Sequence, residues 1–393
     1  MVRPASDVIR VLHLSRDFPP RRTGGLSTAV GDMVQTLAEL GTECAVVSFD
    51  RWRPRRRVAK GELLLETRHG ARIARVNGPG ALDPALEFGR EFSPTIIHVH
   101  HSMLWSAAAE LRRELSVPVV ASVHVAQAHQ NRLRGIERTA SSDAQQVELS
   151  QADAVIAPSP AVARILLAAD PTLAPRLSVI PLGARDTARA RAAAAAPEKR
   201  DSGLILYAGR FADINGTEEM LLALPQILGR FPRATAVLAG GLPENRRAEA
   251  RWLQRWRDRA PDDLAGRVHF PGWLEPDDLS ELYARCAVLV SPSWFETFGL
   301  VVLEAMLHGA PIAAARSGGV ESMVRDRDSG VLLSPRDSAA IAHATCAILD
   351  DRELAQELGE RAAHRARSSF LWPAIAPQLC ELYESLTCSD RIA

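Results

Sequence analysis

Short apolar runs alternate with helix-like segments along this 393-residue chain, and the alternation begins twice. Strands that alternate with helices are typical of a doubly wound parallel sheet. The first series has apolar runs at residues 8–14, 44–48, 96–100, 119–123, 154–157 and 177–180. Apolar residues at helical spacing over 26–40 and 105–115 predict helices between these runs. We therefore predict an N-terminal Rossmann-like α/β domain over residues 1–183.

The second series follows an Ala- and Arg-rich stretch, residues 184–199, which has no apolar period and is interpreted as a linker or an exposed helix. Its apolar runs lie at residues 204–208, 234–239, 267–270, 287–290 and 311–315, with a helix predicted over 217–230. A second Rossmann-like domain is thus predicted over 200–370, and a last helix within 371–393 is expected to return to the first domain. A length of 393 residues also favours two domains over one core. Two such domains that face one another across a cleft would bind a small ligand between them.

Two carboxylates, Glu296 and Glu304, stand eight positions apart in the second series. The apolar run at 287–290 precedes them, so the order is strand, acidic turn, helix. In an open α/β sheet this order places Glu296 at the carboxyl edge, where ligands bind. The turn continues as Thr297, Phe298, Gly299 and Leu300, whose amides become free donors at a helix N-terminus and favour an anion. Carboxylates beside an anion site suit a ligand with hydroxyls and phosphate, such as a nucleotide sugar.

Composition excludes several other classes of protein. Lys+Arg and Asp+Glu each total 47, so no net field favours nucleic acid. No run of about 18 apolar residues would span a membrane, and the N-terminus lacks the pattern of a signal peptide. The five cysteines are scattered and favour reduced thiols. We expect a cytoplasmic protein of unknown oligomeric state.

Together these motifs resemble those of the retaining GT-B glycosyltransferases of family 4, which include glycogen synthases and bacterial mannosyltransferases. The resemblance covers nearly the whole chain. Besides the spaced carboxylates, it rests on the motifs Thr23-Gly24-Gly25-Leu26, Ser122-Val123-His124, Ala157-Pro158-Ser159, Val179-Ile180-Pro181-Leu182-Gly183, Gly209-Arg210 and Ser317-Gly318-Gly319-Val320. It implies a GT-B fold and a hexosyltransferase that moves a sugar from a UDP- or GDP-type donor to an acceptor hydroxyl with retention. The implied acceptor is a small molecule, a polysaccharide or a lipid-linked molecule.

The resemblance also implies roles at the phosphates. Gly24 and Gly25 would let the backbone approach the diphosphate and the acceptor, because no side chain intervenes. Arg210 would make a charge-assisted contact to the diphosphate as it departs. The amides of Gly299 and Leu300 would bind the same phosphates. No metal or cofactor is required on this interpretation, because Arg and amides neutralise the phosphate charge.

Other implied roles concern the sugars and the base. Glu304 would bind the two ribose hydroxyls, and Glu296 would hold a hydroxyl of the donor sugar near the reacting carbon. His124 would touch the far edge of that sugar, and the loop that carries Trp273 would lie against the base. The leaving phosphate would take the acceptor's proton, so the family needs no enzymic nucleophile.

One position departs from the family pattern. The family has Gly-Arg, four residues and then Lys-Gly, whereas this chain has Asn215 before Gly216. An Asn brings no charge to a diphosphate. Three interpretations remain open: an Arg such as Arg316 or Arg246 compensates, the donor has another leaving group, as in a sugar 1-phosphate, or the chain is a non-catalytic sugar-nucleotide-binding homologue.

The histidines at 98, 100 and 101 look like a metal cluster, but no carboxylate or cysteine ligand lies beside them in the sequence. We interpret them as histidines at a strand end and predict no metal site.

The run from Arg51 to Arg57 contains five arginines and Trp52. Such a run is usually a solvated loop, although it could also make weak peripheral contact with an anionic membrane. Co-sedimentation with anionic liposomes tests this minority hypothesis, and the absence of salt-sensitive binding would end it.

Overall fold

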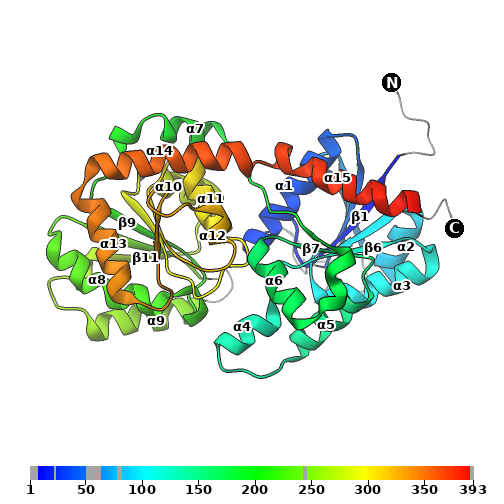
Figure 1. The fold of residues 1–393 in the computed structure, drawn as a ribbon, viewed down its shortest axis with the longest axis horizontal. Helices are drawn as coiled ribbons and strands as arrows, with labels where there is room; N and C mark the ends of the chain where they lie inside the picture. Colours follow the sequence, from blue (N-terminus) through cyan, green and yellow to red (C-terminus); the bar gives the residue numbers. More distant parts are fainter. Residues whose placement is uncertain (1–7, 22–23, 50–62, 78–81, 242–245, 390–393) are drawn as a thin grey trace. The chain divides into compact units, whose positions relative to one another are not determined.

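A computed structural model describes residues 8–21, 24–49, 63–77, 82–241 and 246–389. The chain divides into two compact units, residues 1–183 with 372–393 and residues 184–371. Figure 1 shows that each unit has helices on both faces of its own sheet. Each unit is therefore a three-layer α/β structure of the predicted class.

The sheet of the first unit has eight strands in the order β3-β4-β2-β1-β5-β6-β7-β8. Its strands are β1 (Arg10–Ser15), β2 (Glu43–Ser48), β3 (Leu63–Arg68), β4 (Ala71–Val76), β5 (Ile96–Val99), β6 (Val119–Ser122), β7 (Ala154–Ala157) and β8 (Leu177–Val179). Only the β3–β4 pair is antiparallel. The apolar runs predicted six of these strands, and β3 and β4 were missed because charged residues such as Glu66 and Arg75 interrupt them.

The helices of the first unit cover both faces of this sheet. They are α1 (Gly25–Glu39), α2 (Leu82–Phe92), α3 (Trp105–Leu115), α4 (Gln127–Leu133), α5 (Ala140–Gln151), α6 (Pro160–Ala169) and α15 (Trp372–Ser389), with 3-10 turns η2 (Ser102–Leu104) and η3 (Pro171–Arg176). Helix α15 packs against α1, whereas α2 packs against α3, and Figure 1 shows these two pairs on opposite faces. The last helix therefore completes the first unit, as the sequence predicted.

Arg75 fixes the loop that leads from β1 to α1. Its side chain is 1% exposed. The guanidinium donates to the carbonyl oxygens of Phe18 at 3.1 Å and Pro19 at 2.6 Å. It also pairs with the carboxylate of Glu66 at 2.7 Å. A buried charge with a charged partner and carbonyl acceptors is satisfied, so this unpredicted strand holds the loop that precedes Gly24.

Glu148 on α5 makes the stability of the protein depend on pH. It is 2% exposed, and Oε1 has no hydrogen-bond partner among the described residues. Burial raises the pKa of this carboxyl to about 8 from an ordinary 4.5. Because the folded-state pKa is the higher one, the stabilising contribution is complete below about pH 4.5 and is lost as the pH rises through 8.

We expect Glu148→Gln to be more stable than the parent at pH 8 by up to a few kcal/mol, since the amide never ionises. The difference should vanish near pH 4.5. Urea unfolding at both pH values measures it, with the exposed Glu137→Gln as the control. An equal difference at both pH values would contradict this assignment.

The sheet of the second unit has six parallel strands in the order β11-β10-β9-β12-β13-β14. These are β9 (Leu204–Gly209), β10 (Thr235–Gly240), β11 (Val268–Gly272), β12 (Val288–Ser291), β13 (Ile312–Ala315) and β14 (Val331–Leu333). The chain order reverses between β9 and β12. Ligands of such sheets bind outside the carboxyl ends of the strands at this reversal.

The helices of the second unit are α7 (Ala188–Ala194), α8 (Thr217–Arg230), α9 (Arg246–Arg259), α10 (Pro276–Arg285), α11 (Leu300–Leu307), α12 (Val320–Met323), α13 (Ser338–Asp350) and α14 (Arg352–Ser369), with 3-10 turns η4 (Pro197–Lys199), η5 (Asp213–Asn215) and η6 (Ala265–Arg267). Helix α8 packs against α13, whereas α11 packs against α14 and α10. A core of side chains from α8, α9 and α13, including Trp256 and Leu224, covers one face of the sheet.

Residues 184–199 do not form an extended linker. They contain α7 and η4 and belong to the second unit, so the helical interpretation is the correct one and the linker boundary was wrong. Ala190 on α7 is 1% exposed, and α7 packs against α10. Arg200, directly after this stretch, donates to the carbonyl oxygens of Tyr283 and Cys286 at 2.9 and 3.1 Å. These contacts explain why an Ala- and Arg-rich stretch is ordered here.

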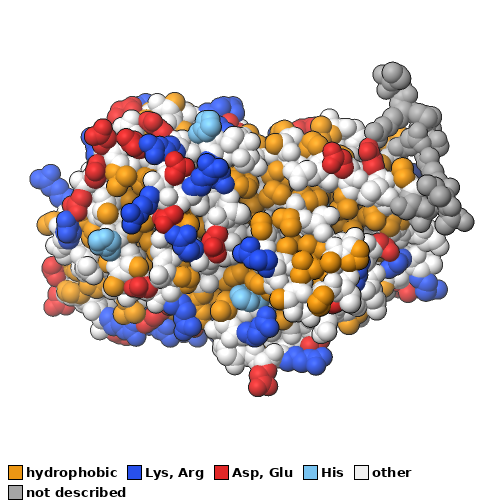
Figure 2. Space-filling view, in the orientation of Figure 1, with side chains coloured by type: hydrophobic (Ala, Val, Ile, Leu, Met, Phe, Trp, Pro, Cys, Tyr) orange, Lys and Arg blue, Asp and Glu red, His pale blue; other side chains and the backbone are white. Residues whose placement is uncertain are grey.

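No helix within the described ranges is long and apolar enough to cross a bilayer. On the face drawn in Figure 2, basic and acidic side chains are interspersed over the second unit. The basic run 51–57 lies outside the described residues, so its predicted membrane contact stays a prediction.

Candidate active site

Two turns meet at the carboxyl ends of β9 and β12. The amide of Trp294 donates to the carbonyl oxygen of Ile214 at 2.9 Å. Gly216 has φ 70°, and a Cβ there would lie 2.2 Å from the carbonyl oxygen of Pro292. Only glycine allows this approach without strain. The Gly-Arg turn and the acidic turn, which lie some eighty residues apart in the sequence, therefore form one surface at the expected edge of the sheet.

Glu296 is a half-buried carboxylate in this surface. The hydroxyl of Ser293 donates to its Oε1 at 2.7 Å. Burial raises the pKa of Glu296, whereas the Ser293 hydrogen bond and the positive charge of Arg210 lower it. A carboxylate with one oxygen anchored by the protein is placed to accept a hydroxyl of a bound ligand with the other.

The turn formed by Ser317-Gly318-Gly319 supports the backbone of Glu296. The amide of Gly319 donates to the carbonyl oxygen of Glu296 at 2.8 Å. The hydroxyl of Ser317 donates to the carbonyl oxygen of Ser293 at 3.1 Å. Gly318 has φ 58°, and a Cβ there would lie 1.9 Å from the carbonyl oxygen of Glu296. The Ser317-Gly318-Gly319 motif therefore fixes the position of the acidic turn.

We expect Gly318→Ala to destabilise the protein by roughly 2 kcal/mol or more, because the added Cβ clashes with backbone and the left-handed conformation is strained. Urea unfolding measures the loss. Gly229→Ala in α8 is the matched control, since no atom lies within 4 Å of the position that the added methyl group would take and alanine favours a helix. An unchanged unfolding midpoint for Gly318→Ala would contradict the supporting role.

The N-terminus of α11 follows the acidic turn. Gly299 is the N-cap residue, with φ 104°, and no side chain accepts from the first amides of this helix. Thr297 and Phe298 are buried, 7% and 3% exposed. Uncapped amides at a helix N-terminus carry partial positive charge and bind anions. The amides of Gly299 and Leu300 lie at this N-terminus, whereas Phe298 precedes the N-cap residue, and their binding of phosphate stays a prediction.

Glu304 lies one turn further along α11. The hydroxyl of Tyr283 on α10 donates to its Oε2 at 3.1 Å. Burial raises the pKa of Tyr283 well above its ordinary value, and the charge of Glu304 adds to this. Tyr283 therefore stays a neutral donor that orients the carboxylate. Tyr283 was not predicted from the sequence, because no local pattern marks a tyrosine 21 residues before its partner.

Tyr207 joins β9 to the Gly-Arg turn. Its buried hydroxyl contacts the Thr217 hydroxyl at 2.9 Å and donates to the carbonyl oxygen of Arg210 at 3.1 Å. Burial is the main cause of the raised pKa of Tyr207. The charges of Glu296 and Glu219 add to it, and that of Arg210 opposes it. The charges of two carboxylates and of one exposed guanidinium thus act on this hydroxyl.

Asn215 stands at the expected lysine position in the same turn. Its Oδ1 is buried without a hydrogen-bond partner among the described residues. Nearby, the indole of Trp294 donates to Glu219 Oε1 at 2.8 Å, while Glu219 Oε2 is also buried without a partner there. Arg316, one expected substitute for the lysine, pairs with Asp326 at 2.7 Å, and the side chain of Arg246 lies outside the described residues. This part of the site has more acceptors than donors.

The loop after β11 carries Trp273, which is half-buried. Gly272 before it has φ 81°, and a Cβ there would lie 2.9 Å from a carboxylate oxygen of Glu249 on α9. Phe270 contacts the ring of Phe211 with centroids 5.8 Å apart. Glycine therefore allows the tight turn that carries Trp273 at the edge of the sheet.

Three predicted site residues belong to the first unit. Gly24 is the N-cap residue of α1 and has no side-chain cap, and apart from its chain neighbours no described residue has an atom within 4 Å of a Cβ built on it. Gly25 is exposed. His124 follows β6, and its Nε2 is hydrogen-bonded to Nδ1 of His100 at 3.1 Å. The open backbone at the start of α1 fits an approach by an anion.

Comparison with known families decides what kind of protein carries this site. Residues 23–187 match the family described as Glycosyltransferase Family 4, and residues 202–351 match the family described as Glycosyl transferases group 1. The chain belongs to these glycosyltransferases. The two matches fall in the two units and include every predicted site residue.

Relatives of this glycosyltransferase are similar over nearly their full length. A glycogen synthase from Mycobacterium tuberculosis is 28% identical over 98% of this chain and 96% of its own. A D-inositol 3-phosphate glycosyltransferase from Corynebacterium efficiens is 27% identical over 97% and 96%. Among solved structures, a sucrose-phosphate synthase from Thermosynechococcus elongatus has a TM-score of 0.80 at 24% identity, covering 97% of this chain and 100% of that chain. Anabaena HepE has a TM-score of 0.73 at 19% identity, covering 96% and 100%. The GT-B fold of this glycosyltransferase is therefore the predicted one.

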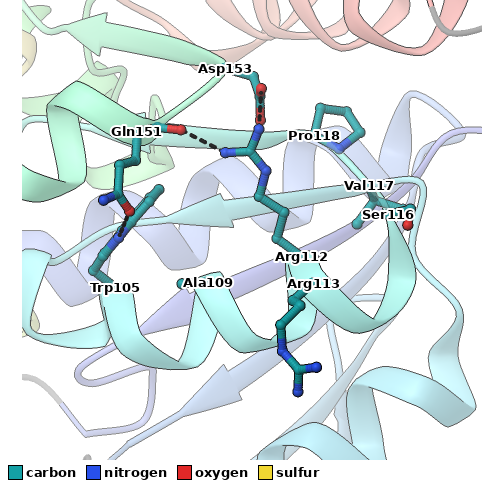
Figure 3. Close-up of a pocket in the computed structure, with 9 residues that line it drawn as sticks. All are labelled: Trp105, Ala109, Arg112, Arg113, Ser116, Val117, Pro118, Gln151 and Asp153. Atoms are coloured by element: carbon teal, nitrogen blue, oxygen red, sulfur yellow. Dashed lines mark hydrogen bonds and ion pairs between the residues drawn. The ribbon is translucent and has the colours of Figure 1, made fainter.

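A surface hollow of about 570 Å³ lies elsewhere in this glycosyltransferase, between the end of α3 and the start of β6 (Figure 3). Arg112 crosses it and pairs with Asp153 at 2.8 Å, while its other nitrogen donates to the carbonyl oxygen of Gln151 at 2.6 Å. These polar groups satisfy one another. The hollow lies at the amino end of β6, the opposite edge from the one where α/β sheets bind ligands, so we do not assign the active site to it.

Proposed function

We propose that this enzyme transfers a hexosyl group from a nucleoside-diphosphate sugar of the UDP or GDP type to an acceptor hydroxyl, with retention of anomeric configuration. The observation that carries the proposal is the pair of oriented carboxylates around the α11 N-terminus. Glu296 is held by Ser293, Glu304 is held by Tyr283, and the uncapped amides lie between them. One ligand that has hydroxyls on both sides of a diphosphate suits all three groups.

Ligands bound to structural neighbours support the type of donor. HepE was solved with UDP-glucose and with UDP. A starch synthase IV from Arabidopsis thaliana was bound to ADP and acarbose. These proteins share the fold with this chain, and a nucleoside diphosphate is common to their ligands.

In the proposed reaction, the bond between the anomeric carbon and the phosphate oxygen breaks and its electron pair stays on the phosphate. The acceptor oxygen attacks from the same face, and its proton passes to a phosphate oxygen. Arg210 and the α11 amides stabilise the negative charge that develops on the leaving diphosphate. Glu296 holds a hydroxyl of the donor sugar, Glu304 the ribose hydroxyls, His124 the far edge of the sugar and Trp273 the base.

We further propose that transfer needs no metal or cofactor, because the guanidinium and the amides supply the positive charge. The enzyme is assigned to the cytoplasm, which is supported by its five free cysteines. The acceptor is a small molecule, a polysaccharide or a lipid-linked hydroxyl.

The direct test measures release of nucleoside diphosphate from a panel of UDP-, GDP- and ADP-sugars with and without acceptors, in EDTA and in Mg²⁺. We expect turnover with one nucleotide sugar at equal rates in both conditions, and an NMR spectrum of the product with the donor's anomeric configuration. Inversion would refute the same-face reaction. A rate that collapses in EDTA and returns with Mg²⁺ would refute metal independence.

Asn215 gives a prediction about the donor. We expect Asn215→Lys to lower the KM for the nucleotide sugar by about 5- to 10-fold, because a charge-assisted contact replaces a neutral one. The carboxylates of Glu219 and Glu296 favour a cation at this position. Steady-state kinetics measures the change, and Asn215→Ala, which adds no charge, is the control. Weaker use of every diphosphate donor by the lysine variant, together with turnover of a sugar 1-phosphate, would instead favour a donor with another leaving group.

A further inference from the structure

Two side-chain contacts join α10 to α11 at Glu304. The hydroxyl of Tyr283 donates to Glu304 Oε2 at 3.1 Å, and Nε2 of His308 lies 2.7 Å from the hydroxyl oxygen of Ser280. Ser280 and Tyr283 are three residues apart on α10, whereas Glu304 and His308 are four residues apart along α11 and its C-cap. Residues at these spacings lie on one face of a helix. The two contacts therefore form a polar seam between the facing sides of α10 and α11.

The two partners of His308 fix the position of its hydrogen. Nδ1 lies 2.7 Å from the carbonyl oxygen of Glu304, which can only accept. Burial lowers the pKa of His308, the contact with this carbonyl opposes the effect, and the charges of three arginines add to it, so the ring is neutral at pH 7. Nδ1 therefore carries the one hydrogen, and Nε2 accepts from the hydroxyl of Ser280. Thus His308 ties the main chain of Glu304 to α10, while Tyr283 ties its side chain.

Arg200 holds the C-terminal ends of the same two helices together. Its Nη1 lies 2.9 and 3.1 Å from the carbonyl oxygens of Tyr283 and Cys286, at the end of α10. Its Nη2 donates to the carbonyl oxygen of His308, the C-cap residue of α11. The last carbonyls of a helix have no partner within it and carry partial negative charge, which a guanidinium neutralises. One cation therefore fixes the end of α10 against the end of α11.

These contacts bear on a ligand because they all act on one carboxylate. A glutamate that a ligand must first order loses rotamer freedom, and this loss weakens binding. Here the hydroxyl of Tyr283 orients Glu304 before a ligand arrives, and the polar seam keeps α10 and α11 at the distance that this hydrogen bond needs. A carboxylate held in one orientation can accept two neighbouring hydroxyls with its two oxygens. The polar seam therefore suits recognition of a pair of adjacent hydroxyls.

We propose that Arg200, Ser280 and His308 are positioning residues for ribose recognition. They fix α10 against α11, so that Tyr283 holds Glu304 in the orientation that accepts both ribose hydroxyls. The enzyme then binds a nucleoside diphosphate more tightly than its 2′-deoxy counterpart. The contact between Glu304 and ribose rests on the function proposed above. The polar seam and the hydrogen position on His308 do not, because they belong to the protein without ligand.

Calorimetry of the full chain with UDP, GDP and ADP, each beside its 2′-deoxy counterpart, measures this preference. For the diphosphate that binds, we expect the Kd of the 2′-deoxy form to be about 10- to 100-fold higher, the effect of one hydrogen bond to a charged group. Tyr283→Phe, which removes only the hydroxyl, should lower this ratio of Kd values about 3- to 10-fold. Ser280→Ala should lower it in the same direction, because His308 then loses its partner on α10.

Matched variants separate positioning from stability. Arg200→Lys keeps a cation at the helix ends and should retain more of the ratio than Arg200→Gln. Tyr383→Phe removes a similarly buried hydroxyl, 2.7 Å from Nδ1 of His98 in the first unit, and should leave the ratio unchanged. Nitrogen-15 NMR of the unliganded full chain, labelled at histidine, adds a measurement that needs no ligand. We expect Nδ1–H for His308, with its signal assigned by its loss in His308→Gln.

Three results would each overturn the proposal: an Nε2–H signal for His308, equal binding of the ribose and 2′-deoxy forms by the parent, or a ratio that Tyr283→Phe and Ser280→Ala leave unchanged while both lower the unfolding midpoint. The last result is the one expected of a seam that serves helix packing alone. Arg200→Gln could fail to fold, in which case the Tyr283 and Ser280 variants decide. If the ratios respond as expected but no nucleotide sugar is turned over, the positioning role stands and the proposed transfer fails. If none of the diphosphates binds, both fail.

Discussion

Glu296→Ala is expected to lower kcat by about 100- to 1000-fold, the range seen when one preorganised polar group at a reacting centre is removed. The carboxylate is half-buried, and Ser293 anchors one of its oxygens. Its other oxygen is placed to hold a sugar hydroxyl close to the carbon that reacts. Because that contact orients the transition state, we expect a larger effect on kcat than on KM. Steady-state rates of nucleoside diphosphate release measure both.

The exposed Glu321 on α12 offers a matched control for this substitution. Glu321→Ala removes the same charge from the same unit and should leave kcat unchanged. Glu296→Gln keeps the shape and one acceptor oxygen, so its loss should be smaller than that of Glu296→Ala. If Glu296→Ala retained normal turnover, the assignment of the whole acidic turn to the donor sugar would be wrong.

Arg210→Ala is expected to lower kcat/KM by about 100-fold, since one charge-assisted contact to the departing diphosphate is lost. Asn215 is neutral where the family pattern has a lysine, so this turn offers no other cation to replace Arg210. Weaker inhibition by the free nucleoside diphosphate should accompany the loss, because that product makes the same contact. The exposed Arg233→Ala, which removes a guanidinium from the same unit, is the control.

The same substitution should change the pH dependence. Burial raises the pKa of Glu296, and Arg210 opposes that effect. Without Arg210 the pKa of Glu296 rises further, so the pH range in which activity increases with ionisation of Glu296 should move to higher pH. A profile that stays in place while kcat/KM falls would place Arg210 too far from Glu296 to influence it.

Most of the strands could be predicted because a buried parallel strand is a continuous apolar run. Residues 204–208 and 287–290 are such runs, and β9 and β12 form there. The strands β3 and β4 could not be predicted in this way. Arg75 interrupts β4 with a charge that only its distant partners, Glu66 and two carbonyl oxygens, make acceptable in the core. Similarly, residues 188–194 have no apolar period, and packing of this helix against α10, α11 and α14 orders them.

The candidate site likewise has a part that local sequence predicts and a part that only tertiary packing decides. Local spacing was enough to place Glu296, the α11 amides and Glu304 together, because a strand, a turn and a helix in immediate succession have one arrangement. The roles of Tyr283 and Gly318 could not be predicted from local spacing. The first orients Glu304 from another helix, and the second approaches the carbonyl oxygen of Glu296 from the loop that follows β13.

The sequence by itself determined the two α/β units, the edge of each sheet at which ligands are expected to bind, and the family through its ordered motifs. These properties follow from periodicity and from turns a few residues long. Only the tertiary structure decided the state of the groups at that edge. The raised pKa of Glu296, the excess of acceptors around Asn215 and the hydrogen bond between His100 and His124 each depend on side chains from separate strands and helices, which lie far apart in the sequence.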